Sequence, residues 1–229
     1  MSYLDYQPRR PRQPGPFARM RLWSVTTWLI AVNVAIFVLN IVTGNLLYHV
    51  GYFSALTAVY GMQVWRFITF QFLHANVEHI FFNMLTLYFF GPLIEGYLGA
   101  RRYLAFYLLC GASGAAMYML LMYVGVLPDG PKTALVGASA GIYGVLIAAA
   151  RVAPDARVML LFPPIPIKLR VLAWIFIGIA VFTIVQQGHN AGGQAAHLGG
   201  AALGFLLISK PQVLNVFEFG RSQNRSRWR

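Results

Sequence analysis

Charged residues, and acidic ones above all, are scarce in this sequence of 229 residues. Only 10% of the residues are charged, and six are aspartate or glutamate. A water-soluble domain of this size needs far more surface charge, so a soluble globular enzyme is excluded. The sequence also has a single cysteine, Cys110, which excludes an internal disulfide and a cysteine-rich metal site.

What is abundant is hydrophobic sequence, which makes up 58% of the chain and occurs in long runs. No Asp, Glu, Lys or Arg occurs within residues 22–42, 103–127, 133–150 or 171–209. About 18 apolar residues are enough to cross a bilayer as a helix, so we predict an all-α polytopic membrane protein. The six expected transmembrane helices are 22–42, 77–96, 102–124, 139–153, 169–187 and 194–210, with the sequence GHNAGG at 188–193 separating the last two.

The net charge of +12 lies mainly in the segments that flank or join these spans. With a cytoplasmic N-terminus, 16 of the 18 Lys and Arg residues fall on the cytoplasmic side. The positive-inside rule therefore predicts a multi-pass protein of the cell (inner or plasma) membrane with both termini cytoplasmic. Such flanking charges contact the lipid bilayer rather than nucleic acid. We expect a basic N-tail (1–21), a six-span domain (22–210) and a basic C-tail (211–229).

The segment between the first two spans, residues 43–76, is rich in aromatic side chains and forms the first outer loop. Aromatic residues favour the interface between membrane and water. We therefore expect a long membrane-associated loop that forms short amphipathic helices in the outer leaflet. Its aromatic residues are Tyr48, Tyr52, Phe53, Tyr60, Trp65, Phe67, Phe70 and Phe72.

Three groups of polar residues lie inside predicted spans, where each polar group is costly and invites a functional explanation. His79 and Asn83 are four residues apart, on one face of the second span. Ser139 opens the fourth span, and His197 lies near the start of the sixth. These three spans all run inwards, so the four residues lie at a similar depth below the outer surface.

Small residues predict that two of these groups also meet laterally. The fourth span carries glycines at 137, 141 and 144, and the sixth carries glycines at 200 and 204, so their backbones can approach closely. A serine beside a histidine is a minimal pair of nucleophile and general base. Free N–H groups at a helix N-terminus can stabilise an oxyanion. The pattern thus favours hydrolysis by a serine.

The order and spacing of these motifs resemble the bacterial, six-span type of rhomboid intramembrane serine protease, over residues 22–209. The matching elements are Trp65-Arg66, the set His74, His79 and Asn83, the GxSx motif at 137–140, AHxxG at 196–200, Phe90-Gly91-Pro92 with Glu95 and 99–102, and the sequence LFPPIPIK at 161–168.

The resemblance implies a catalytic role for the four polar residues of the spans. Ser139 would be the nucleophile and His197 its general base, in a dyad without an acidic third member. His79, Asn83 and the backbone N–H of Ser139 would form the oxyanion hole. The substrates of the family are single-span membrane proteins, cut near the outer end of a span that unwinds easily.

The resemblance also implies supporting residues. Tyr143 would pack against the ring of His197 and fix its orientation, and Gly137 belongs to the serine motif. His74 matches a position that supports the site, and Arg66 would shape the outer loop. Neither a metal nor another cofactor is expected.

One departure concerns the serine motif, which in the family most often reads Gly-x-Ser-Gly. Here Ala140 follows Ser139, and alanine suits this position if it begins a helix but not if it must adopt a left-handed conformation. Ser113, in the sequence GASG at 111–114, matches the motif better. It lies about twelve residues into the third span, roughly 18 Å deep, where no polar group is expected to activate it. We therefore expect Ser139 to be the nucleophile.

Other classes of function fit less well. A metalloprotease needs His-Glu-x-x-His, but Glu78 directly precedes His79 and no second histidine follows at helical spacing. An aspartyl protease needs two intramembrane aspartates, whereas Asp5, Asp129 and Asp155 lie in tails or loops. The remaining alternative is a catalytically weak or inactive rhomboid-like protein that binds membrane proteins or controls their quality.

Overall fold

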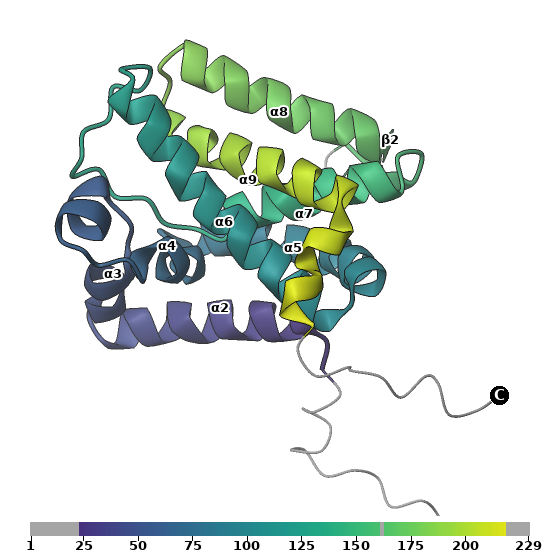
Figure 1. Cartoon of the computed structure of the whole chain (residues 1–229), viewed down its shortest axis with the longest axis horizontal. Helices are drawn as coiled ribbons and strands as arrows, with labels where there is room; N and C mark the ends of the chain where they lie inside the picture. The colour runs from purple at the N-terminus through teal and green to yellow at the C-terminus, as the bar shows by residue number, and fades with distance from the viewer. Residues whose placement is uncertain (1–22, 161–162, 219–229) are drawn as a thin grey trace, which may run out of the picture.

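The computed structural model describes residues 23–160 and 163–218, which form a helical bundle (Figure 1). Its main helices begin and end within three residues of the predicted spans. Four of them are long and apolar enough to cross a membrane, whereas α7 and α8 are apolar but have only 14 and 17 residues. The main helices are α2 (Val25–Val42), α5 (Val77–Leu98), α6 (Ala100–Tyr123), α7 (Ser139–Val152), α8 (Leu169–Val185) and α9 (Ala191–Ser209).

The break between α8 and α9 is shorter than predicted. Helix α9 already begins at Ala191, so two of the glycines in the predicted separator belong to its first turn. The chain turns at Asn190, which belongs to the predicted separator, and at Gln187, which precedes it; their φ angles are 64° and 48°. Gly192 has a packing role, because a Cβ there would stand 2.5 Å from Oδ2 of Asp129.

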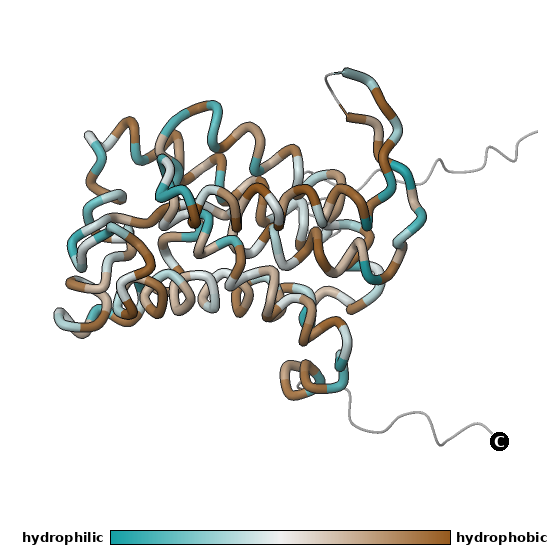
Figure 2. The backbone as a smooth tube through the Cα atoms, turned by 90° about the horizontal axis from the view of Figure 1, so that it is seen from above, coloured by the Kyte–Doolittle hydropathy of each residue, from teal (hydrophilic) through white to brown (hydrophobic). Residues whose placement is uncertain are grey.

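Helix α9 packs against α6, α7 and α8 (Figure 1). Its small residues allow this contact, since a Cβ at Gly200 would overlap the carbonyl oxygen of Ala140. One turn further on, a Cβ at Gly204 would stand 2.5 Å from Cα of Gly144. The glycines of the fourth and sixth predicted spans therefore bring the backbones of α7 and α9 together. Figure 2 shows that hydrophobic residues run along the lengths of the helices.

Helix α2 lies on the far side of the bundle from α8 (Figure 1), and a glutamate of α5 holds its first turn. The Glu95 carboxylate accepts hydrogen bonds from the backbone N–H groups of Val25 and Thr26, at 2.7 and 2.9 Å. It also accepts one from Thr26 Oγ1 at 2.8 Å. N–H groups in the first turn of a helix have no partner within the helix, so a carboxylate there stabilises it.

The expected outer segment does contain short helices, and it contacts the chain just before α7. These elements are α3 (Leu46–Gly51), the π-helical turn η1 (Leu56–Tyr60), α4 (Arg66–Thr69) and the 3₁₀ turn η2 (Phe70–Phe72). Phe53 and Leu135 exchange backbone hydrogen bonds of 3.0 and 2.7 Å. The N–H of Gly137 donates to the carbonyl oxygen of Phe70 at 3.0 Å. The outer segment thus fixes the backbone two residues before Ser139.

A β-hairpin that the sequence did not predict joins α7 to α8. Strand β1 (Arg157–Met159) pairs antiparallel with β2 (Pro166–Lys168), and the hairpin projects beyond the helices (Figure 2). At its base, Asp155 forms ion pairs with Lys168 and Arg170 at 3.0 and 3.1 Å. The hydrogen bond from Lys168, together with the two positive charges, lowers the pKa of the Asp155 carboxyl.

The predicted C-tail begins with a folded element, the 3₁₀ helix η3 (Pro211–Phe217), which packs against α6 and α9 with Leu214 fully buried.

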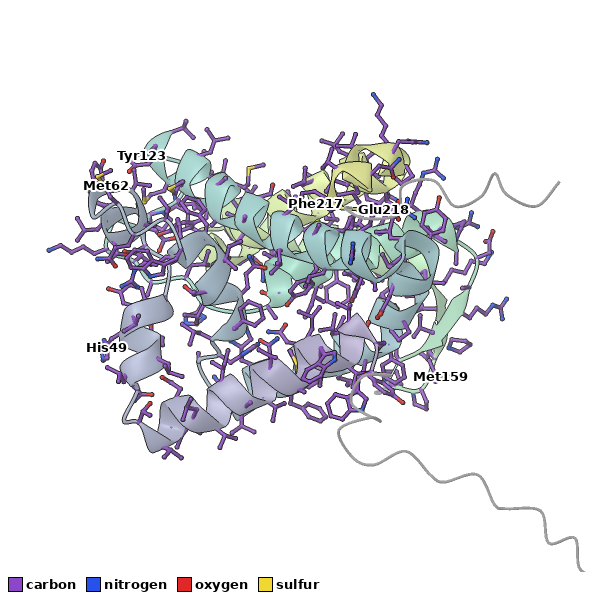
Figure 3. All side chains as sticks on the ribbon, turned by 60° about the horizontal axis from the view of Figure 1, so that its bottom comes forward. His49, Met62, Tyr123, Met159, Phe217 and Glu218 are labelled. Carbon is purple, nitrogen blue, oxygen red and sulfur yellow. The ribbon has the colours of Figure 1, made fainter. Side chains whose placement is uncertain are left out.

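His49, Met62 and Tyr123 lie toward one end of the molecule, and Met159 and Glu218 toward the other (Figure 3). The predicted N-tail and residues 219–229 lie outside the described residues.

Candidate active site

The structure brings Ser139 and His197 into direct contact. Ser139 is the first residue of α7, and His197 lies in the second turn of α9. Their Oγ and Nε2 atoms are 2.7 Å apart, a hydrogen-bonding distance. The contact depends on the close approach of α7 and α9 at their glycines. Gly200 of α9 packs against the backbone of Ala140, the residue that follows Ser139.

Two more side chains contact the His197 imidazole. The ring of Tyr143 stacks on it, with centroids 4.1 Å apart and an interplanar angle of 16°. Phe176 of α8 contacts Tyr143 edge-on at 5.7 Å. On the other edge of the imidazole, Nδ1 lies 3.0 Å from Oε1 of Gln194. Gln194 was not among the residues predicted from the sequence, although its spacing of three residues from His197 on one helix was a usable signal.

Gly137 and His79 lie next to the Ser139 side chain. Gly137 has a φ of +129°, which favours glycine. A Cβ there would stand 2.8 Å from both Cε1 and Nε2 of His79, and 3.5 Å from Ser139 Oγ. The His79 ring thus lies close to the Ser139 hydroxyl. Its own backbone N–H donates to Oδ1 of Asn76, the N-cap of α5, at 2.7 Å.

Asn83 follows His79 by one turn of α5 and is buried, with 7% of its surface exposed. Its Nδ2 has no hydrogen-bond partner among the described residues. A buried amide without a partner is costly, so this donor is available to a group that enters the site. Within the part of the chain that the structure describes, this amide therefore donates to no atom of Ser139.

The ring of His74 contacts the ring of His79 edge-on, with centroids 5.1 Å apart. It is only 4% exposed, and within residues 23–160 and 163–218 neither of its ring nitrogens has a hydrogen-bond partner. Burial, and secondarily the charge of His79, lowers the pKa of His74 to about 3. A neutral imidazole therefore supports His79.

Arg66 lies in the outer segment, and its hydrogen bonds are to other residues of that segment rather than to Ser139 or His197. Its guanidinium donates to Oε1 of Gln63 and to the carbonyl of Tyr52, both at 2.6 Å, and to the carbonyl of His49 at 3.0 Å. It also lies over the Tyr52 ring, 4.8 Å from the centroid. The side chain is buried despite its charge, because these acceptors replace water.

The second serine motif serves helix packing. Ser113 donates its hydroxyl to the carbonyl of Gly199 at 3.0 Å. A Cβ at Gly114 would stand 2.5 Å from Cβ of Ala140, so the two motifs face each other. Ala140 is helical and is not among the residues with positive φ. The left-handed conformation belongs to Gly137 instead, so alanine suits position 140.

Metal-binding side chains do not gather near these residues. The described part of the chain holds no cluster of three or more His, Cys, Asp or Glu residues that could bind a metal ion. Cys110 is buried in the hydrophobic core.

Comparisons with known proteins point to one family. A family model described as Rhomboid domain matches residues 61–210. RHOMBOID-like protein 12, mitochondrial, of Arabidopsis thaliana is 28% identical over 191 residues, covering 79% of this chain and 56% of the relative. Rhomboid protease GluP of Bacillus subtilis is 33% identical over 145 residues, covering 61% and 26%.

A human relative aligns over more of the chain. Presenilin-associated rhomboid-like protein, mitochondrial, of Homo sapiens is 26% identical over 216 residues, covering 87% of this chain and 54% of the relative. The chain spans about half the length of the curated relatives it matches, or less.

Proposed function

The chain belongs to the rhomboid family and is a multi-pass membrane protein, and on this premise we propose that it is an intramembrane serine endopeptidase. The observation that carries the proposal is the 2.7 Å contact between Ser139 Oγ and His197 Nε2. At this distance a histidine can take the proton of a serine as the serine attacks.

In the first half of the reaction, Ser139 Oγ attacks the carbonyl carbon of the scissile peptide bond while His197 Nε2 accepts the hydroxyl proton. Negative charge develops on the carbonyl oxygen. The N–H of Ser139 has no acceptor within α7, since it is at the first helical position. Together with His79 and Nδ2 of Asn83, which has no partner in the described part of the chain, it supplies donors for that oxygen.

In the second half, the tetrahedral intermediate collapses and His197 gives its proton to the leaving amine, which leaves an ester on Ser139. A water molecule then attacks the ester carbon and loses a proton to His197. When the intermediate collapses, the proton returns to Ser139 Oγ and a carboxylic acid is released. Ser139 and His197 are half-buried rather than sealed, which leaves room for water to enter.

The proposal includes a topology. All six main helices span the membrane, both termini are cytoplasmic, and the outer segment lies in the outer leaflet. It is supported by the placement of 16 of the 18 Lys and Arg residues on one side. The substrates are single-span proteins of the same membrane, the cell membrane, cut near the outer end of their span. The basic tails contact anionic lipid.

The test is labelling of the purified full chain in detergent with a fluorophosphonate probe, which reacts covalently with an activated serine. We expect the wild type to be labelled, Ser113→Ala to be labelled equally, and Ser139→Ala and His197→Ala to be unlabelled. Labelling that persists in Ser139→Ala would assign the nucleophile elsewhere. A folded wild type that resists labelling would instead favour a binding or quality-control protein.

A further inference from the structure

We propose that Gln194 is a positioning residue that holds the His197 imidazole in the tautomer needed for a general base. The inference rests on the proposed function and deepens it, because it makes the Ser139–His197 pair a three-membered chain. The carrying observation is the 3.0 Å contact between Gln194 Oε1 and His197 Nδ1, on the ring edge that faces away from Ser139.

Tautomer matters because a neutral imidazole carries only one N–H. To take a proton from Ser139, the Nε2 atom must present a lone pair, so the N–H must be on Nδ1. An Nδ1–H needs an acceptor, and the amide oxygen of Gln194 lies at that distance. With the opposite tautomer, Nε2–H would donate to the serine hydroxyl and could not act as its base.

Tyr143 cannot supply this selection, although it touches the same ring. Its stacked contact restricts the plane of the imidazole, but the face of an aromatic ring does not distinguish Nδ1 from Nε2. Among the described residues, His79 of α5 is the titratable group whose charge acts on His197, and the Asp129 carboxylate lies at Gly192, in the first turn of α9. Of the side chains in the described residues, only Gln194 forms a hydrogen bond with Nδ1.

The backbone of α9 holds Gln194 in place for this contact. Its N–H donates to the carbonyl of Asn190, the N-cap, at 3.1 Å, so Gln194 lies in the regular first turns of the helix. It is one helical turn before His197, a spacing at which side chains on a helix meet. An amide is neutral and carries an NH₂ group as well, so it biases the tautomer less than a carboxylate does.

Two substitutions with opposite expected effects test the inference in the full chain. Gln194→Met keeps the length of the side chain and removes the acceptor, and we expect the loss of this hydrogen bond to slow fluorophosphonate labelling of Ser139 about ten-fold. Gln194→Glu keeps an acceptor, so labelling continues. Its carboxylate also stabilises the protonated imidazole, so the acid limb of the pH–rate profile moves to higher pH.

Gln186→Glu is the matched control, because it adds the same charge at an exposed position at the end of α8. We expect its pH–rate profile to superimpose on that of the wild type. Thermal unfolding of each variant checks that the fold is intact. Wild-type labelling rates in Gln194→Met, or a Gln194→Glu profile that coincides with the Gln186→Glu profile, would overturn the inference.

A second measurement separates this inference from the proposed function. ¹⁵N spectra of the histidine side chains report which ring nitrogen carries the proton, whether or not the protein reacts with the probe. We expect the His197 signal, identified by its loss in His197→Phe, to show Nδ1–H in the wild type and a mixture of tautomers in Gln194→Met. The same tautomer in both proteins refutes the role of Gln194. If the tautomers differ but the wild type is not labelled by the probe, only the proposed protease activity is refuted.

Discussion

The methyl group of Ala140 packs against Gly114, so closely that a Cβ at position 114 would stand 2.5 Å from the Cβ of Ala140. The two serine motifs of the sequence, GASG and VGASAGIYG, are therefore partners in one helix contact. Gly114, the last residue of GASG, has no side chain and so leaves space for the methyl group of Ala140 in VGASAGIYG. This relationship explains how alanine is accommodated directly after the serine.

We predict that Gly114→Ala destabilises the protein by about 1–3 kcal/mol, because overpacking forces α6 away from α7. It should also slow labelling of Ser139, which is adjacent to the contact. Adding Ala140→Gly removes one of the two clashes, but the carbonyl of Ala196 would still be 2.7 Å from the new Cβ. The double variant should thus recover only part of the stability, measured by thermal unfolding in detergent. Full recovery would place the clash at Ala140 alone.

Two glycines with positive φ allow a matched test of the serine loop. Gly137 has a φ of +129° and lies against His79, whereas Gly125 has a φ of +76° and nothing within 4 Å of its added Cβ. Alanine at either position strains the backbone by about 1–3 kcal/mol. Only Gly137→Ala also displaces His79, so it should lower the labelling rate at least ten-fold while Gly125→Ala stays near the wild type. Equal losses in both would mean that strain, not the position of His79, controls the site.

The hydrogen bonds from the first turn of α2 to Glu95 predict a loss of stability when the carboxylate is replaced. Bonds to a charged group contribute about 1.5–3 kcal/mol, so Glu95→Gln should lower the free energy of unfolding by an amount in this range. Glu78→Gln is the control, because Glu78 is exposed in the first turn of α5. Its loss should be below about 1 kcal/mol. If the two variants unfold alike, Glu95 does not anchor α2.

The helices were predictable from sequence, because hydrophobic runs mark where they begin and end. The flanking charges predict the direction of each span, and with it a common depth for Ser139, His79, Asn83 and His197. Lateral contacts were less accessible. Glycine spacing suggested that α7 and α9 meet, but the pairing of Ala140 with Gly114 depends on which faces of three helices pack together, and no single-helix pattern encodes that.

Short-range polar contacts were missed for a different reason. Glutamine and asparagine side chains have several rotamers of similar energy, and packing selects among them. The spacing of Gln194 and His197 allows a contact, but only the structure shows that this rotamer is chosen. The hairpin of β1 and β2 escaped notice because each strand has only three residues, too few for a periodic pattern to appear.

The depressed pKa of His74 predicts an acid-sensitive fold. With a folded pKa of about 3 and an unfolded pKa of about 6.5, the unfolded state binds the proton more tightly. The stability from a neutral His74 is complete above about pH 6.5 and is lost as the pH falls towards 3. Between pH 7 and pH 5 the loss from this group is about 2 kcal/mol. His74→Phe should reduce the pH dependence by that amount in chemical denaturation, and an unchanged dependence would show that His74 is not the group responsible.

Asn83 predicts that stability and activity change in opposite directions. Its buried Nδ2 lacks a partner among the described residues, which costs about 1–3 kcal/mol when no ligand is bound. Asn83→Leu removes that buried donor in a side chain of similar shape and should raise the unfolding temperature. The same change removes a proposed oxyanion donor, so labelling of Ser139 should fall about 100-fold or more. Asn33→Leu is the control, because Asn33 is also buried but donates its Nδ2 to the carbonyl of Leu29 at 2.8 Å, within α2. It should leave the labelling rate near that of the wild type. A stabilised Asn83→Leu that is labelled normally would remove Asn83 from the oxyanion hole and leave the backbone N–H of Ser139 and His79 as its donors.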